Sequence, residues 1–129
     1  MKILDTDHCV AVLRRRLDLD QAAPRDEPLA TTVITVAELV HGALRSKHPA
    51  ETLAATNAFL SQLIVLPFSE RGARVFAQRR AELERGGQRL DHLDLEIASI
   101  ALAHEAPLIT HNRAHFDRVP GLVIEDWLA

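Results

Sequence analysis

The chain has 129 residues, 47% of them hydrophobic, and a formal net charge of -3 with a pI near 6.1. This length suits one compact domain spanning residues 1–129 and leaves no room for a second. The acidic balance excludes a globally basic nucleic-acid binder, so any contact with nucleic acid has to come from a local basic patch.

The N-terminal segment and the single cysteine predict a protein that remains in the cytoplasm. Acidic residues begin at Asp5, so no signal-peptide hydrophobic region precedes them. No apolar run approaches the roughly 20 residues of a membrane-spanning helix. Cys9 lies in an apolar segment without a disulfide partner and is expected to be a buried thiol. We therefore expect a soluble cytoplasmic protein that does not bind membranes.

Five short apolar runs alternate with longer segments of helical periodicity. This alternation predicts an α/β fold, with a central parallel sheet of four to five strands flanked by helices. The expected strands are residues 2–4, 31–34, 64–66, 108–109 and 122–124. The expected helices are residues 10–17, 36–44, 49–63, 70–85 and 95–104.

Two of the connections carry clear signals. Residues 18–28 contain acidic residues and two prolines with little periodicity, which predicts an exposed loop within the domain. Gly86 and Gly87 follow a helical segment and are typical of a helix C-terminus followed by a turn.

Acidic and polar residues gather near the ends of the predicted strands. Asp5 and Asp7 follow the first strand, Glu38 lies past the second, Thr110 and Asn112 follow the fourth, and Asp91 and Asp94 begin the helix before it. Ligands of an open parallel sheet bind beyond the carboxyl ends of its strands. Carboxylates crowded there repel one another unless a cation neutralises them, and hard oxygen ligands favour Mg²⁺ over zinc. The pattern therefore predicts a magnesium-dependent phosphodiesterase site.

Each of these carboxylates has a simpler alternative role at a helix start. Thr35 and Glu38 have the spacing of a capping box, Asp91 and Asp94 suit the first turn of a helix, and Asp5 or Asp7 can cap the helix that follows them. Helix capping explains each residue singly, but it does not explain why acidic groups crowd one edge of the sheet. Both interpretations stay open at this point.

Four segments, in this order and spacing, resemble the VapC-type PIN domains, which are the ribonuclease toxins of VapBC toxin–antitoxin pairs. The segments are ILDTD, TVITVAELVHGA, LDHLDLEIASIALAH and PLITHNRAHFDRVPGLVIEDW, and the match spans the whole chain. The resemblance implies one PIN domain that cleaves RNA with a divalent metal held by acidic residues. By position, those residues are Asp5, Glu38 and Asp94.

The fourth acidic position departs from the family pattern. Many relatives carry Asp two residues after Thr110, where this chain has Asn112, a residue that can still orient water. Asp117 is near enough in sequence to act instead. The resemblance implies that Thr6 and Thr110 orient the acidic groups. The implied catalytic set is Asp5, Glu38, Asp94 and either Asn112 or Asp117, with Mg²⁺, or Mn²⁺ as a substitute, on Asp5, Glu38 and Asp94.

The resemblance also implies three partners: a structured RNA such as tRNA, a cognate VapB-like antitoxin, and a second copy of the chain in a homodimer. The few aromatic residues argue against base stacking, which favours folded RNA recognised by shape. The consecutive arginines at positions 14–16 have an alternative role as a solvent-exposed helix face. Candidate contacts to RNA phosphates are Arg14, Arg15, Arg16, Arg45, Lys47, Arg113 and Arg118.

Two other function classes remain open. A haloacid-dehalogenase-like phosphatase would use Asp5 as nucleophile and Asp7 as general acid, but no lysine follows a late strand. A catalytically silent partner-binding module would offer the apolar faces of the helices at 10–17 and 36–44 to a partner helix.

His111 and His115 are four residues apart and raise the question of a zinc site. The glutamate of an H-E-x-x-H motif does not accompany them. We therefore interpret them as surface histidines.

Overall fold

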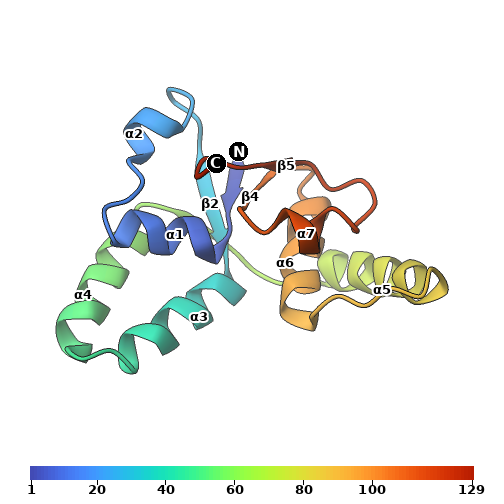
Figure 1. The fold of residues 1–129 in the computed structure, drawn as a ribbon, viewed down its shortest axis with the longest axis horizontal. Helices are drawn as coiled ribbons and strands as arrows, with labels where there is room; N and C mark the ends of the chain where they lie inside the picture. The colour runs from blue at the N-terminus through green and yellow to red at the C-terminus, as the bar shows by residue number, and fades with distance from the viewer.

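A five-stranded parallel sheet, in the order β3-β2-β1-β4-β5, forms the centre of the fold in a computed structural model that describes residues 1–129 (Figure 1). Ile3 of β1 lies opposite Ala30 of β2 on one side and Leu108 of β4 on the other. The strands are β1 (Lys2–Leu4), β2 (Leu29–Thr32), β3 (Ile64–Leu66), β4 (Leu108–Ile109) and β5 (Ile124–Glu125).

Helices cover both faces of the sheet, so the predicted α/β architecture is confirmed (Figure 1). None of them has the length and apolar character needed to cross a bilayer. They are α1 (Thr6–Leu13), α2 (Leu19–Ala22), α3 (Val33–Leu44), α4 (Pro49–Leu60), α5 (Glu70–Arg85), α6 (His92–Ala103) and α7 (Arg113–Phe116).

Alternating strand residues pack into two separate hydrophobic cores, one on each face of the sheet. Ile3 and Leu108 pack with α6, whose buried face includes Ile97 and Ile100. Their sequence neighbours Leu4 and Ile109 point the other way and pack with α1, α3 and α4. Because successive side chains of a strand point to opposite faces, even strands of two or three residues contribute to both cores.

The second strand and the helix after it differ from the prediction. The expected strand at 31–34 ends at Thr32, because the Thr32 hydroxyl caps α3 by accepting a hydrogen bond from the Thr35 amide at 3.2 Å. Val33 and Ile34 fit either periodicity, and the cap decides for helix. Thr35 is therefore not the N-cap, and the Glu38 carboxylate is free to point elsewhere.

The first helix begins earlier than the prediction of residues 10–17. Asp5 caps it by accepting from the Thr6 amide at 2.8 Å, and it ends at Leu13, two residues before Arg15, which has a positive φ of 58°. The predicted loop at 18–28 contains the short helix α2, which is capped by Asp18. Because polar residues occupy the first turn of each helix, the hydrophobic periodicity does not show where the helix begins.

The strand order changes direction beside β1. From β1 the chain builds outward through β2 to β3, and it then crosses back to add β4 and β5 on the other side. In open parallel sheets, ligands bind at such a switch point, beyond the carboxyl ends of the two diverging strands. Here those ends are Leu4 of β1 and Ile109 of β4, which pair directly.

Truncation of the larger core tests this packing. Ile100 is fully buried, and Ile100→Ala is expected to lower the free energy of unfolding by about 2–5 kcal/mol, because it removes apolar contacts and leaves a cavity. Leu44→Ala is the matched control, since Leu44 is 57% exposed. Urea denaturation of both variants measures the difference, and equal losses would contradict the packing described.

Candidate functional site

Asp5 lies at the switch point of the sheet, directly after β1. Its side chain is 6% exposed, and its carboxylate faces Thr110, the residue that follows β4. Thr110 donates its hydroxyl hydrogen to Asp5 Oδ2 at 2.7 Å, and the Thr6 amide donates to Asp5 Oδ1 at 2.8 Å. Two segments about a hundred residues apart in sequence therefore meet at one buried carboxylate.

Burial raises the pKa of Asp5 to about 6, because a buried carboxylate loses its hydration. The hydrogen bonds from Thr110 and Thr6 oppose this effect, whereas the negative charges of Asp7 and Asp94 add to it. The negative charges of Asp5, Asp7 and Asp94 are thus only partly compensated by hydrogen bonds, so a cation bound at Asp5 would be favourable.

Glu38 reaches the same region from α3. The Thr6 hydroxyl donates to Glu38 Oε1 at 2.8 Å and lies 3.0 Å from the hydroxyl of Thr35. Thr6 has a single hydroxyl hydrogen, so Thr35 donates to Thr6 while Thr6 donates to Glu38. Thr6 therefore connects Glu38 to Asp5, through its side chain and its backbone amide respectively.

Asp94 reaches the region from the first turn of α6. Asp91, as predicted for this helix start, caps α6 by accepting from the amides of Leu93 and Asp94. The Asp94 carboxylate contacts His115 instead, with Oδ2 3.1 Å from Nδ1 of the ring. The same nitrogen lies 2.9 Å from the side-chain amide of Asn112.

Asn112 closes the network. Its backbone amide donates to the Thr110 hydroxyl at 3.1 Å, so Asn112 touches both the Asp5 side and the Asp94 side. A continuous series of polar contacts, hereafter the acidic network, thus joins four of the five residues predicted for the site. It consists of Asp5, Glu38, Asp94 and Asn112, with Thr6, Thr35, Thr110 and His115 between them. At His115 Nδ1 only one of the two contacts is a hydrogen bond, because a ring nitrogen that donates to Asp94 cannot also accept from the Asn112 amide.

Asp117, the fifth predicted residue, lies outside this network. It follows α7, its side chain is 62% exposed, and its only ionic contact is with Arg113 at 3.8 Å. Asn112, rather than Asp117, therefore stands next to the other predicted residues.

The donor set of the acidic network suits a hard divalent cation held partly through water. As the side chains stand, no three His, Cys, Asp or Glu groups converge to form a ready-made chelate. Mg²⁺ commonly uses only one or two carboxylates and keeps several waters, so full convergence is not required. The one thiol, Cys9, is buried with its pKa raised to about 12 by burial, which excludes it as a soft ligand.

The network around Asp7 was not anticipated. Asp7 Oδ1 lies 2.7 Å from Nδ1 of the fully buried His8, and Oδ2 accepts from the His111 amide at 2.9 Å. Burial alone would raise the pKa of Asp7, but the hydrogen bonds from the His8 ring and the His111 amide outweigh it and lower that pKa. The only local signal was the D-x-D pattern of Asp5 and Asp7.

His111 and His115 lie at the surface as predicted, with side chains 62% and 49% exposed. Each ring nonetheless contacts a different carboxylate. His111 Nδ1 lies 2.7 Å from Asp126, whereas His115 contacts Asp94. The two rings therefore do not form a shared metal site.

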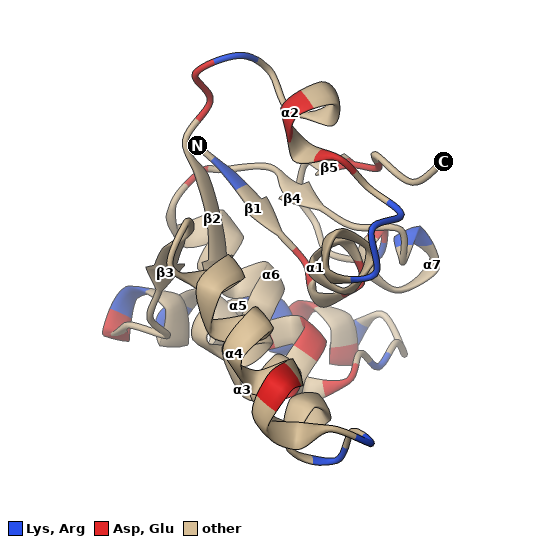
Figure 2. Cartoon of the chain, turned by 90° about the vertical axis from the view of Figure 1, so that its left-hand side faces the viewer, with Lys and Arg blue, Asp and Glu red and all other residues tan.

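Two sets of the predicted basic residues adjoin elements that carry network residues. Arg113 directly follows Asn112, and the exposed run Arg14–Arg16 follows the far end of α1; Figure 2 shows basic residues on α7 and at the end of α1. Arg113 donates to the carbonyl of Ile124, and Arg118 donates to the carbonyl of Arg89. Arg113, at the start of α7, is thus the predicted basic residue that adjoins the network in sequence.

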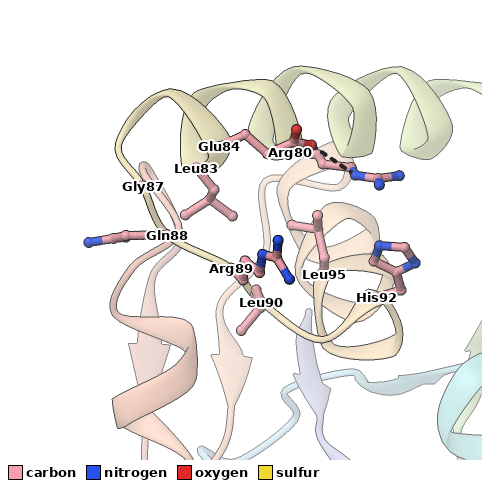
Figure 3. Close-up of a pocket in the computed structure, with 9 residues that line it drawn as sticks. All are labelled: Arg80, Leu83, Glu84, Gly87, Gln88, Arg89, Leu90, His92 and Leu95. Carbon is pink, nitrogen blue, oxygen red and sulfur yellow. Dashed lines mark hydrogen bonds and ion pairs between the residues drawn. The ribbon is translucent and has the colours of Figure 1, made fainter.

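A cavity of about 620 Å³ lies between α5 and α6, and none of the predicted site residues lines it (Figure 3). Its walls come from the last turns of α5, the loop 86–91 and the start of α6. Arg80 and Glu84 form an ion pair at its edge (Figure 3). The predicted site residues therefore lie at the switch point and not in this cavity.

Comparisons with known proteins agree with one another. A family profile described as "PIN domain" matches residues 2–122. Ribonuclease VapC2 of Rickettsia felis is 34% identical over 97% of this chain and 96% of the relative. A crystal structure of VapBC2 from Rickettsia felis, bound to a DNA fragment from the promoter, matches with a TM-score of 0.89 at 33% identity, covering 98% of each chain. The tRNA(fMet)-specific endonuclease VapC of Shigella flexneri is 33% identical over 97% of this chain and 96% of the relative.

The raised pKa of Asp5 predicts a pH-dependent stability. A carboxyl group with a raised pKa stabilises the fold below its unfolded pKa near 4, and this contribution is lost as the pH rises through about 6. With divalent cations chelated, ionised Asp5 is expected to cost up to about 3 kcal/mol at neutral pH. Asp5→Asn is expected to remove this part of the pH dependence. Denaturant unfolding at about pH 4 and pH 7 measures it, and identical profiles for the two proteins would contradict the assignment.

Proposed function

We propose, from the premise that this chain belongs to the PIN-domain family and is a VapC-type ribonuclease toxin, that it hydrolyses phosphodiester bonds of structured RNA at the acidic network with Mg²⁺. The observation that carries this proposal is the meeting of Asp5, Glu38 and Asp94 around Thr6, Thr110 and His115, beyond the carboxyl ends of β1 and β4.

Asp5, Glu38 and Asp94 are the residues that would hold the metal. Asp5 is the most constrained of the three, because both of its oxygens already accept a hydrogen bond. When bound, Mg²⁺ would polarise the scissile phosphate and lower the pKa of the attacking water, with Mn²⁺ as a substitute. A cation would also relieve the repulsion among Asp5, Asp7 and Asp94 that contributes to the raised pKa of Asp5.

The protein groups around the carboxylates would fix them and handle protons. Thr6 and Thr110 hold the oxygens of Glu38 and Asp5, which reduces the side-chain entropy lost on binding. The exposed carboxylate of Glu38 would accept a proton from the attacking water. The Asn112 side chain would orient a water or a phosphate oxygen, completing the fourth position of the set.

The substrate we propose is a folded RNA, with tRNA as the specific candidate. A relative 33% identical to the chain is named as a tRNA(fMet)-specific endonuclease. The phosphate backbone needs cationic partners that the acidic network cannot supply, and Arg113 at the start of α7 and Arg118 just after it are candidates for this role. The chain has only 4% aromatic residues, which favours recognition by shape and backbone over base stacking.

We further propose a VapB-like antitoxin as protein partner and a homodimer as the assembled form. The Rickettsia felis structure is of VapBC2, which supports a partner of this kind. The face between α1 and α3 would receive an apolar helix of that partner, since Val12, Val36 and Val40 are only partly buried and Leu44 is 57% exposed. An arginine of the antitoxin would suit the carboxylates of the acidic network.

The phosphatase alternative loses its support. It needs the Asp7 carboxyl as a free general acid, but both Asp7 oxygens are engaged by His8 and by the His111 amide. The related proteins are ribonucleases and not phosphatases.

The central prediction concerns Asp94. Asp94→Asn is expected to reduce the rate of RNA cleavage by about 100-fold or more. Loss of a residue that only supports the metal ligands typically costs about 10–100-fold. The exposed Asp20→Asn is the matched control, since it makes the same chemical change far from the network. The assay is cleavage of a tRNA mixture with Mg²⁺ or Mn²⁺, and full activity of Asp94→Asn would refute the proposed site.

A second pair of variants distinguishes the two candidates for the fourth position. Asn112→Ala is expected to slow cleavage by about tenfold, because its amide lies within the acidic network. Asp117→Asn is expected to cleave at nearly the wild-type rate, because Asp117 contacts only Arg113. Single-turnover cleavage rates provide the measurement, and the reverse order of activities would assign the role to Asp117.

A further inference from the structure

We propose that the C-terminal residues Asp126 and Trp127 are positioning residues for the nuclease site, acting through His8, Asp7 and His111 on the Thr110 hydroxyl that holds Asp5. This inference rests on the proposed function, because it assigns a role relative to Asp5 as a catalytic residue. The family profile ends at residue 122, before this segment begins.

The C-terminal segment contacts the first turn of α1 directly. The backbone amide of Trp127 donates to Nε2 of His8 at 3.0 Å, and the two rings meet edge to face with centroids 6.3 Å apart. His8 is fully buried, so these contacts are shielded from water. The hydrogen bond from the Trp127 amide matters for stability, because a buried ring nitrogen without a hydrogen-bond partner would lower the free energy of unfolding.

Asp126 makes the second contact of the segment. Its side chain is only 8% exposed, and Oδ2 lies 2.7 Å from Nδ1 of His111. Oδ1 accepts from the Leu128 amide at 2.8 Å, which fixes the turn of the chain after β5. The pKa of Asp126 is lowered, since the hydrogen bonds from the Leu128 amide and the His111 ring outweigh the effect of desolvation.

The hydrogen bonds of His8 determine which ring nitrogen carries hydrogen. The Trp127 amide is always a donor, so Nε2 must accept. Nδ1 therefore carries the hydrogen and donates it to Asp7 Oδ1, 2.7 Å away. The 3.6 Å approach of Asp126 to Nε2 then involves no shared hydrogen. The C-terminal segment thus sets the tautomer that holds Asp7.

Asp7 transmits this constraint to the catalytic carboxylate. Its Oδ2 accepts from the His111 amide at 2.9 Å and lies 3.3 Å from the Thr110 hydroxyl. Thr110 has one hydroxyl hydrogen, which it donates over the shorter distance of 2.7 Å to Asp5. Displacement of Asp7 would alter both the turn at His111 and the competition for that hydrogen.

The backbone supports the same turn from β5. The Thr110 amide donates to the carbonyl of Glu125 at 2.9 Å, one residue before Asp126. β4 and β5 have only two residues each, so few ladder bonds fix the position of Thr110. The side-chain contacts of Asp126 and Trp127 therefore supply restraint that the short strands lack.

The test compares two adjacent acidic residues of the same segment. Asp126→Ala is expected to lower kcat for RNA cleavage about tenfold with little change in KM, because the substrate surface is intact while Asp5 is less well held. Glu125→Ala removes the ion pair with Lys2 on the other side of the segment and is expected to change kcat by less than about twofold. Asp126→Asn can still bond the His111 ring and the Leu128 amide, and it is expected to restore most of the lost kcat.

A spectroscopic readout separates positioning from general destabilisation. In the metal-free protein, the ¹⁵N shifts of the His8 ring are expected to show hydrogen on Nδ1. The His111 amide signal is expected to move in Asp126→Ala and to stay in place in Glu125→Ala. Thermal melting of each variant shows whether it is folded at the assay temperature, so that only folded proteins are compared. The NMR measurement can also be made at a lower temperature for a variant that is too unstable for kinetic assays.

The outcomes separate this inference from the proposed function. If Asp5→Asn is inactive while Asp126→Ala keeps wild-type kcat and an unmoved His111 amide, the positioning role is wrong and the nuclease site stands. Full activity of Asp5→Asn would overturn both. Equal losses of kcat in Asp126→Ala and Glu125→Ala would also overturn the positioning role, because they would indicate a nonspecific effect of the C-terminal segment.

Discussion

The structure depends on the burial of one carboxylate, Asp5, where β1 and β4 separate. Removing a charge from water is unfavourable unless hydrogen bonds or a cation compensate for it. The Thr6 amide and the Thr110 hydroxyl compensate in part, and the pKa of about 6 shows that the compensation is incomplete. The fold therefore maintains a site at which a divalent cation would be stabilising. Stability given up at an active site in exchange for a prepared binding geometry is a common arrangement in enzymes.

Helix capping is distributed so that two of the three acidic side chains remain free. Thr32 caps α3 and Asp91 caps α6, so neither Glu38 nor Asp94 is needed for capping. Only Asp5 has both roles, because it caps α1 with one oxygen and faces Thr110 with the other. The capping and metal-site interpretations of the same carboxylates are thus compatible. Capping fixes the helix starts, and those starts place the acidic side chains along the same edge of the sheet.

Much of this arrangement could be predicted from sequence, and the exceptions have physical reasons. The α/β class and the positions of Asp5 and Asn112 after strand ends follow from the pattern of a parallel sheet, whereas the choice of Asp5, Glu38 and Asp94 as one set comes from the family resemblance. The boundaries of β2 and α3 could not be predicted, because Val33 and Ile34 satisfy both periodicities until the Thr32 cap is known. The link between His8 and Trp127 joins residues 119 positions apart and has no periodic signal. The exclusion of Asp117 from the acidic network depends on the orientation of α7, which no local pattern specifies.

Direct measurement of metal binding tests the central claim, that Asp5 is a metal ligand whose buried charge is neutralised by the cation. Mn²⁺ binding to the wild-type protein can be followed by titration calorimetry in several buffers at about pH 6, where Asp5 is half protonated. Binding is expected to release a fraction of a proton from this group, and Asp5→Asn is expected to lose both this release and most of the affinity. Equal Mn²⁺ affinity and equal proton release in the two proteins would contradict the central claim.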